Sequence, residues 1–170
     1  MPIEPIFFDT VQTSLGKFYL AATKRGLVRI SFPPNRGAVR QATEVPSAAR
    51  RALNSCKRFL RSYMSGRSAF ETNVPVDWSA FSRFDRLIFK RLQHVPHGSI
   101  VSYGELAARL GFPRAARALG NALARNPIPV LIPCHRVIRS NRSLGGFQRG
   151  ARWKRILLRI DRKIASTQHR

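Results

Sequence analysis

A run of prolines leading to a cysteine most constrains what this chain can fold into. Residues 126–137 read Asn-Pro-Ile-Pro-Val-Leu-Ile-Pro-Cys-His-Arg-Val, which is apolar up to a Cys-His-Arg sequence. Pro129 and Pro133 forbid a helix, and each biases the residue before it toward extended geometry. We therefore expect a stiff, buried, extended segment that ends at Cys134, where a new element begins.

Cys134 supports two interpretations. Free cysteine is among the most buried residue types, which favours a core thiol. A neighbouring His or Arg lowers the pKa of a thiol, and the thiolate attacks soft electrophiles, which favours a nucleophile. The Cys-His pair alone does not decide between them.

The charge of the chain is unusual. Its formal net charge is +23 over 170 residues. Residues 1–80 hold 12 Lys and Arg against 5 Asp and Glu, and residues 81–170 hold 19 against 3. This excess predicts a polyanionic partner, with nucleic acid first and an anionic membrane surface second.

Other features of composition narrow the class. No stretch approaches the ~20 apolar residues of a membrane span, and the N-terminus does not read as a signal peptide. Two cysteines suit neither a disulfide framework nor a zinc cluster. We expect an intracellular, reducing setting, no membrane association and no metal or other cofactor.

Residues 5–32 predict β structure. Turn-forming residues around Gly16 and Gly26 separate short apolar runs, which is typical of a three-stranded antiparallel meander. The runs lie at residues 6–8, 18–21 and 27–32.

Residues 47–64 predict one amphipathic helix. Apolar side chains recur there at helical spacing, and Cys56 lies on that stripe, so we interpret it as a core residue. Residues 65–78 predict a loop and linker. The expected organisation is an N-terminal domain over residues 1–77 and a C-terminal domain over residues 78–170.

The C-terminal half predicts a helix-turn-helix. Ser82 and Ser102 each begin a capping pattern, and the second opens a short helix over residues 103–110. Pro113 suits the first position of a second helix, which we expect over residues 114–124. A last helix should follow the glycine-rich loop at residues 145–150, and residues 164–170 should be a frayed tail.

The second helix of that pair is unusually slim. Alanine and glycine dominate it, and Arg114, Arg117 and Arg125 stand along it. It could be a close-packed helix at a crossing. Alternatively, it could enter a narrow groove of nucleic acid, with arginines for the phosphates and the base stack.

These motifs resemble one family. The segments Asn-Pro-x-Pro and Pro-Cys-His-Arg-Val around Cys134 resemble the active-site signature of the O6-alkylguanine-DNA alkyltransferases, the methylated-DNA–protein-cysteine methyltransferases. The similarity continues through Val-Ser-Tyr-Gly-Glu-Leu-Ala at residue 101, Ala-Ala-Arg-Ala-Leu-Gly at residue 115 and Leu-Gly-Gly-Phe at residue 144. It covers about residues 79–161, whereas residues 1–78 match only in general layout.

The resemblance implies a fold and a reaction. The fold would be α+β, with a ribonuclease-H-like N-terminal sheet and helix and a mainly helical, winged-helix-like C-terminal domain. The protein would flip O6-alkylguanine out of duplex DNA and transfer the alkyl group irreversibly to Cys134. His135 would act as a base through a water, Asp161 would orient it, and Asn126 would hold the turn that presents the cysteine. Tyr103 would lie at the pocket mouth.

The resemblance also implies contacts with DNA and with the flipped base. The slim helix would enter the minor groove, and Arg117 would fill the gap left by the base. The other implied DNA contacts are Ser102, Arg114, Ala115, Ala116, Arg125 and Arg136. Pro129 and Phe147 would form apolar pocket walls and the backbone of Val137 would read the guanine edge, while Leu123 and Gln148 would complete the pocket.

Three positions depart from the family pattern. Asp161 stands where Glu is usual, and its shorter side chain predicts a relay that needs a water or a backbone shift. Phe147 replaces a common Tyr and lacks the hydroxyl. Gln148 and Arg149 replace a common Ser and Gly in the loop.

Two alternatives remain at this stage. A non-catalytic alkyltransferase-like protein would bind the lesion without accepting the alkyl group, and a cysteine hydrolase would turn over. We expect a monomer that acts on double-stranded DNA in the cytoplasm, close to the nucleoid, or in the nucleus of a eukaryote.

Overall fold

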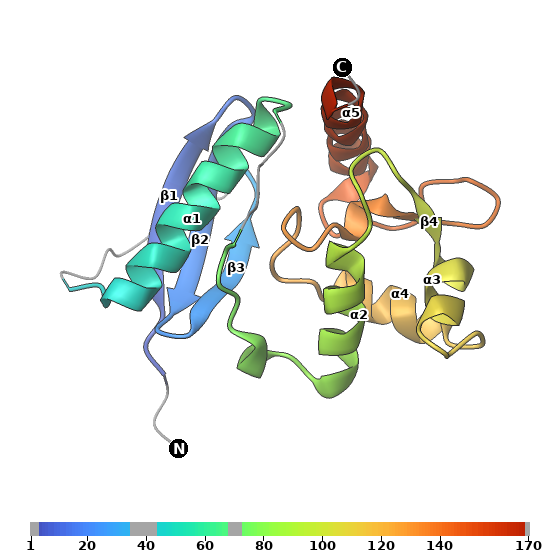
Figure 1. Ribbon diagram of the computed structural model, residues 1–170, viewed down its shortest axis with the longest axis horizontal. Coiled ribbons are helices and arrows are strands. Elements are labelled where there is room, and N and C mark those ends of the chain that lie inside the picture. The colour runs from blue at the N-terminus through green and yellow to red at the C-terminus, as the bar shows by residue number, and fades with distance from the viewer. Residues whose placement is uncertain (1–3, 35–43, 68–72, 169–170) are drawn as a thin grey trace. The chain divides into compact units, whose positions relative to one another are not determined.

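The computed structural model describes residues 4–34, 44–67 and 73–168 of the chain (Figure 1). The chain divides into two compact units, Met1–Ala80 and Phe81–Arg170. Part of the predicted linker, residues 68–72, lies outside the described residues.

The first unit is a small sheet with one helix. Strands β1 (Phe7–Thr13), β2 (Gly16–Thr23) and β3 (Gly26–Ser31) pair antiparallel in the order β1-β2-β3. Helix α1 (Ser47–Met64) packs on this sheet, and a 3-10 turn η1 (Trp78–Ala80) follows (Figure 1). The predicted meander and helix are both confirmed.

Burial explains why α1 lies on the sheet. Its apolar stripe faces the strands, and Cys56 on that stripe is 0% exposed, which confirms its assignment to the core. The facing strand residues are equally buried: Val11, Phe18, Leu20 and Ile30. Removal of these side chains from water stabilises the unit.

The second unit is mainly helical. Its helices are α2 (Arg83–Gln93), α3 (Tyr103–Arg109), α4 (Ala116–Ala124) and α5 (Gly150–Gln168), with a 3-10 turn η2 (Cys134–Arg136). Two short strands, β4 (Val101–Ser102) and β5 (Val137–Ile138), pair in parallel. The α+β class predicted from the sequence is therefore correct.

Capping fixes the start of two helices. The Ser82 hydroxyl accepts a hydrogen bond from the backbone N–H of Asp85 at 3.0 Å. At α3, the Ser102 hydroxyl accepts from the Glu105 N–H at 3.1 Å, and the Glu105 carboxylate accepts from the Ser102 N–H at 2.7 Å. Both predicted caps are confirmed, because these bonds satisfy N–H groups that the helix leaves open.

The second helix of the helix-turn-helix starts later than predicted. It begins at Ala116, and Pro113 lies in the preceding turn rather than at the first helical position. The Ala115 N–H donates to the Phe112 carbonyl at 2.8 Å, which closes that turn. Arg114 and Ala115 therefore precede α4.

The end of the chain also differs from the prediction. α5 extends to Gln168, so residues 164–168 are helical rather than a frayed tail, and residues 169–170 lie outside the described residues. Ile164 is 0% exposed, as is Leu157 seven residues earlier. Continued burial of this stripe stabilises the last turns of the helix.

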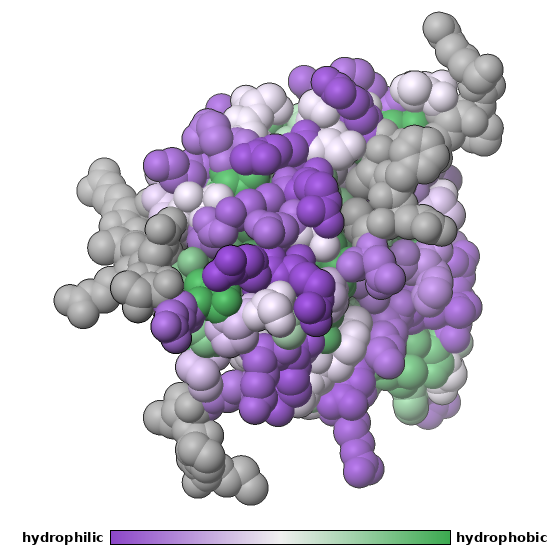
Figure 2. Space-filling model, turned by 60° about the vertical axis from the view of Figure 1, so that its left-hand side comes forward, coloured by the Kyte–Doolittle hydropathy of each residue, from purple (hydrophilic) through white to green (hydrophobic). Residues whose placement is uncertain are grey.

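The face of the molecule drawn in Figure 2 carries mostly hydrophilic side chains. On the face drawn in Figure 2, hydrophobic residues form small, separate patches. Among the described residues, no helix combines the length and the apolar character needed to cross a membrane.

Candidate functional site

The segment before Cys134 is a compact turn rather than an extended run. The Ile132 N–H donates to the Ile128 carbonyl at 3.0 Å, and Val130 has a φ of 76°. That left-handed conformation is a genuine outlier for a β-branched residue. Such strain persists only where the surrounding structure imposes it.

Asn126 is the residue that holds this turn closed. Its side chain is buried, and its amide nitrogen donates to the Ile132 carbonyl at 2.9 Å and to Sγ of Cys134 at 3.1 Å. Its amide oxygen accepts from the Ile128 N–H at 3.1 Å. One side chain therefore ties the two arms of the turn together and orients the thiol.

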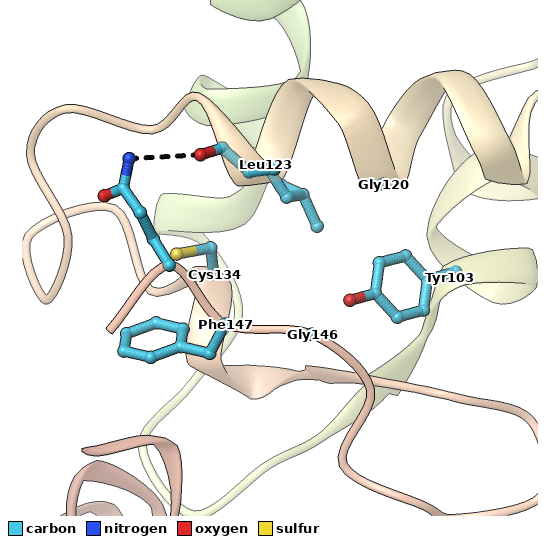
Figure 3. A pocket seen from close by; sticks show the side chains of 8 residues that line it. Tyr103, Gly120, Leu123, Cys134, Gly146 and Phe147 are labelled. Atoms are coloured by element: carbon cyan, nitrogen blue, oxygen red, sulfur yellow. Dashed lines mark hydrogen bonds between the residues drawn. The ribbon is translucent and has the colours of Figure 1, made fainter. Parts of the chain in front are cut away.

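The Cys134 thiol borders a cavity of about 280 Å³. Figure 3 shows the sulfur of Cys134, the ring of Phe147 and the hydroxyl of Tyr103 around this space. The lining residues are Tyr103, Gly120, Leu123, Ala124, Cys134, Gly146, Phe147 and Gln148.

Three of the predicted pocket residues, Leu123, Phe147 and Gln148, line this cavity. Pro129 and Val137 do not: both are buried, and among the described residues they lie outside the lining set. The Val137 carbonyl accepts from Nζ of Lys154 at 2.6 Å, so one of its lone pairs is already engaged. The pocket wall at Pro129 and the guanine contact at Val137 therefore stay predictions.

Tyr103 occupies the mouth of the cavity because glycines leave it room. A Cβ on Gly145, which has a φ of 66°, would lie 3.2 Å from the Tyr103 ring. The hydroxyl points into the cavity (Figure 3). Burial, reinforced by the nearby Cys134, raises the pKa of Tyr103, so the phenol remains a proton donor at neutral pH.

The environment of Cys134 raises the pKa of its thiol to about 11, whereas the sequence interpretation assumed a lowered value. Burial is the main cause, since Cys134 is only 7% exposed. The hydrogen bond from Asn126 and the charge of Lys154 lower the pKa without offsetting burial. The resting group is therefore a thiol that needs a base.

His135, the next residue in the chain, pairs with the carboxylate of Asp161. Nε2 of His135 lies 2.9 Å from Oδ2 of Asp161, a direct contact. The two side chains touch directly, so no water bridges them, and the alternative of a backbone shift stays a prediction. Burial lowers the pKa of His135 despite the carboxylate, so the ring is neutral at pH 7, and with Nε2 donating to Asp161 its Nδ1 is the basic nitrogen.

Arg136 is not a DNA contact, contrary to the sequence prediction. Its side chain is 5% exposed, with Nε at 2.7 Å from Oδ2 of Asp161 and Nη2 at 2.8 Å from Oδ1. Its remaining nitrogen Nη1 donates to the carbonyl of Val95. Arg136 therefore neutralises the buried carboxylate instead of facing solvent.

His97 joins the same cluster. Its Nδ1 lies 2.9 Å from Oδ1 of Asp161. Burial alone would raise the pKa of Asp161, but hydrogen bonds from His135, His97 and Arg136 hold it well below its usual range. No local sequence signal marks this contact, because the two residues are 64 positions apart.

Lys154 is a second residue that sequence reasoning missed. It is 0% exposed, and its Nζ donates to the carbonyls of Val137, Leu144 and Gly146. Burial lowers its pKa to about 8. The signal was present, since Lys154 shares the buried α5 stripe with Leu157, Asp161 and Ile164 at helical spacing.

The glycine-rich loop also reaches across the cavity. Nε2 of Gln148 donates to the Ala124 carbonyl at 3.1 Å, and Figure 3 draws this bond. It links the loop to the C-terminal end of α4, on opposite sides of the cavity. Phe147 and Gln148 therefore form one side of the opening.

α4 presents a slim, basic face to solvent. Its inner side buries Leu119, Ala122 and Leu123, while Arg117 and Ala118 are exposed. Arg117 and Gly120 lie three residues apart on one face of the helix, and Gly120 lines the cavity. Arg117 therefore stands about one turn from the opening.

The other predicted DNA contacts differ in their surroundings. Arg114 is exposed just before α4, and Ala115 and Ala116 are half-buried. Nη2 of Arg125 lies 2.9 Å from Oδ1 of Asp85, and the Ser102 hydroxyl caps α3. Within the described residues, no group of three His, Cys, Asp or Glu side chains gathers so as to hold a metal ion.

A helix-turn-helix beside a cavity with a buried cysteine, a histidine and a carboxylate defines a nucleic-acid-binding protein with a nucleophilic site. Residues 83–163 match the DNA binding domain of 6-O-methylguanine DNA methyltransferase, and residues 6–78 match its ribonuclease-like domain. The chain belongs to the 6-O-methylguanine DNA methyltransferase family.

Relatives and solved structures agree with this membership. The chain is 35% identical over 161 residues to the human methylated-DNA–protein-cysteine methyltransferase, covering 88% of this chain and 77% of the relative. It is 31% identical to that of Methanosarcina barkeri, covering 92% and 97%. The crystal structure of Mycobacterium tuberculosis OGT in complex with DNA matches with a TM-score of 0.75 at 31% identity, covering 93% and 94%.

The raised pKa of Cys134 predicts how the rate of alkylation of the DNA-free protein depends on pH. Iodoacetamide should label Cys134 slowly at pH 7, and the rate should rise about tenfold per pH unit toward pH 11 as the thiolate forms. Peptide mass mapping should find no adduct at Cys56, which is 0% exposed. Cys56→Ala is the control and should keep the profile of the parent protein. Fast labelling at pH 7 that does not change with pH would contradict a protonated thiol.

The lowered pKa of Asp161 predicts how its contribution to the free energy of unfolding depends on pH. A carboxyl whose pKa is lowered by folding stabilises the folded state above its unfolded pKa of about 4, and this contribution is lost as the pH falls through the folded value. Asp161→Asn should therefore cost about 3–5 kcal/mol in urea unfolding at pH 7, because it leaves Arg136 buried without its carboxylate. The difference from the parent protein should shrink as the pH drops below about 4.

Asp85→Asn is the matched control for that experiment. Asp85 pairs with Arg125, whose side chain is 59% exposed, so the loss should be within about 1 kcal/mol. An Asp161→Asn variant as stable as its parent at pH 7 would rule out a stabilising role for this carboxylate.

Proposed function

We propose that this protein repairs DNA by direct reversal, transferring the alkyl group of O6-alkylguanine irreversibly to Cys134. The observation that carries the proposal is the Cys134 thiol at the wall of a cavity that opens beside α4, with a histidine and a buried carboxylate behind it. Membership in the 6-O-methylguanine DNA methyltransferase family and its DNA binding domain supports the same activity.

The reaction is a single displacement. The proton of the Cys134 thiol passes through a water to Nδ1 of His135, and the sulfur attacks the alkyl carbon. A sulfur–carbon bond forms as the bond between that carbon and O6 breaks, and guanine leaves with the electron pair. The guanine then takes one proton, with the hydroxyl of Tyr103 as donor, and the extra proton on His135 passes through solvent to the Tyr103 phenolate.

The raised thiol pKa suits this order of events. A thiol that stays protonated in the resting protein reacts only slowly with other electrophiles, and a neutral His135 is ready to accept its proton. Asp161 stabilises the imidazolium that forms, as the carboxylate of a protease triad does. The thioether product does not release the alkyl group to water, so each molecule acts once and no cofactor takes part.

DNA binding is assigned to α4 and the turn before it. A target base inside a duplex must leave the stack to reach a buried thiol. The small side chains of α4 allow its backbone to approach the minor groove, and Arg117 would fill the gap left by the base. The backbone of the DNA would be contacted by Arg114, Ala115, Ala116 and Ser102, with Arg125 at the far end of α4.

All the groups of the site come from one chain, which supports a monomer on duplex DNA.

The competing functions make different demands on Cys134. A lesion-binding protein without transfer would not need an acceptor thiol, a base and a supporting carboxylate. A cysteine hydrolase would need a route for a second water and would not need a basic helix-turn-helix. The position of Cys134 beside α4 favours alkyl transfer over both.

Intact mass spectrometry tests the proposal. After incubation with duplex DNA carrying O6-methylguanine, the protein should gain one methyl group, which peptide mapping should find on Cys134, with one mole repaired per mole of protein. Unmodified protein that still binds the lesion would show a non-catalytic lesion-binding protein instead. Repair of more than one mole per mole of protein would show turnover and also overturn the proposal.

Arg117→Ala should separate base flipping from chemistry. If Arg117 fills the stack, its loss raises the cost of holding a paired base outside, a cost on the order of a few kcal/mol for a paired base and less for an unpaired one. Transfer from duplex DNA should slow by about tenfold or more, while transfer from single strands should change much less. Equal slowing on both substrates would show that Arg117 does not replace the base.

Arg114→Ala is the matched control for that comparison. As a phosphate contact it should weaken binding about equally on damaged and undamaged duplex, and it should lower the slope of affinity against salt by about one unit. A selective loss on damaged DNA would assign Arg114 to the lesion instead.

A further inference from the structure

The turn between α2 and β4 brings His97 to the carboxylate of Asp161. We propose that His97 is a positioning residue for alkyl transfer: its Nδ1–H donates to Oδ1 of Asp161 and thereby keeps Oδ2 on His135. This inference rests on the proposed function, and it assigns the transfer step a residue outside the Cys134, His135 and Asp161 set.

Four hydrogen-bonding contacts on the carboxylate divide evenly between its oxygens. Oδ2 receives Nε2 of His135 at 2.9 Å and Nε of Arg136 at 2.7 Å. Oδ1 receives Nη2 of Arg136 at 2.8 Å and lies 2.9 Å from Nδ1 of His97. The two Arg136 nitrogens fix the plane of the carboxylate. His135 then holds Oδ2, and His97 holds Oδ1. Without His97, Oδ1 keeps a single strong contact on the Arg136 side, and the carboxylate can move away from His135.

The exposed fractions of the four side chains show which of them faces solvent. The side chains of His135, Asp161 and Arg136 are 0%, 1% and 5% exposed, whereas that of His97 is 24% exposed. His97 is therefore the outermost member of the group and covers Oδ1. A carboxylate screened from water acts more strongly on its partner than a hydrated one does.

Packing of the turn explains why His97 reaches this position. The Val95 carbonyl accepts from Nη1 of Arg136, which anchors the start of the turn. Gly98 has a φ of 76°, and a Cβ there would lie 2.7 Å from Cβ of Ala165 on α5. A glycine is needed for this close approach, and the approach carries His97 onto Asp161 of the same helix.

The tautomer of His97 decides which bond forms. Nη2 of Arg136 also lies 2.8 Å from Nδ1 of His97. Arginine can only donate, so an Nδ1 without a proton would accept from Arg136 and would have no hydrogen to donate to Oδ1. An Nδ1–H instead donates to Oδ1, and the proposal requires this form. The charged groups that face His97 are Asp161 from α5 and Arg136 from η2, with His135 on the far oxygen.

Two substitutions separate the hydrogen bond from the space that the ring fills. In His97→Asn the amide nitrogen stands as many bonds from the backbone as Nδ1 and can donate to Asp161. In His97→Phe a ring of similar width remains, without a donor. His94→Asn is the control, since His94 is an exposed histidine at the end of α2, three residues earlier.

The experiment is a single-turnover measurement with saturating duplex DNA carrying O6-methylguanine. His97→Phe should lower the transfer rate constant by about tenfold, as expected for loss of a hydrogen bond to a charged group, while His97→Asn should stay within about threefold of the parent. The Kd for the same DNA, measured with Cys134→Ala added to each variant, should not change. Equal rates for His97→Phe and the parent, or equal losses in both variants, would overturn the proposal.

A spectroscopic readout keeps the inference testable apart from transfer. In the parent protein and in His97→Asn, the Nε2–H proton of His135 should appear in the NMR spectrum as a slowly exchanging, downfield resonance held by Asp161. In His97→Phe it should broaden or shift, with thermal unfolding measured in parallel to establish that the protein is folded. An unchanged resonance in His97→Phe would overturn the positioning role, whereas a parent protein that transfers no methyl group at all would overturn the proposed function and leave this measurement standing.

Discussion

The Asp161 carboxylate is the interaction on which the site depends. It is 1% exposed, and a charge buried that deeply is costly unless it is paired and hydrogen-bonded. Arg136 supplies the balancing charge, and His135 and His97 occupy one oxygen each. Three segments of the second unit meet there: the turn after α2, the η2 turn that carries the cysteine, and α5. The same contact therefore holds the tertiary structure together and orients the base.

A second buried network holds the walls of the cavity in a comparable way. Lys154 donates to three carbonyls and so joins the glycine-rich loop to β5, directly after the cysteine turn. Asn126 performs the same task on the other side, where it closes the turn before Cys134 and reaches the sulfur. The thiol thus lies between two polar anchors in an otherwise apolar setting. Its burial raises the pKa, and the anchors lower it again in part.

This arrangement relates protection of the thiol to its reactivity. A cysteine that reacts once and is consumed must not be lost to other electrophiles before it meets its substrate. A high pKa keeps it protonated, and reaction then requires His135 and a substrate held in the cavity. In the proposed function, the slim α4, with Arg117 one turn from the opening, brings a DNA base to that cavity.

The amino-acid sequence by itself determined the features that depend on neighbours along the chain. The meander, the apolar stripe of α1 with Cys56, and the Ser102–Glu105 capping box follow from periodicity and from cap chemistry, both of which are local. The motif around Cys134 likewise indicated the nucleophile and its histidine.

Local rules also failed in places. Proline preferences predicted an extended segment where Asn126 imposes a turn. The prediction of a frayed C-terminal tail did not take into account the buried stripe of α5 that ends in Ile164. Only the tertiary structure decided that the thiol pKa is raised, that Arg136 turns inward, and that His97 reaches Asp161. The physical reason is that burial and pairing of charges depend on partners 25 to 64 residues apart, which no local pattern reveals.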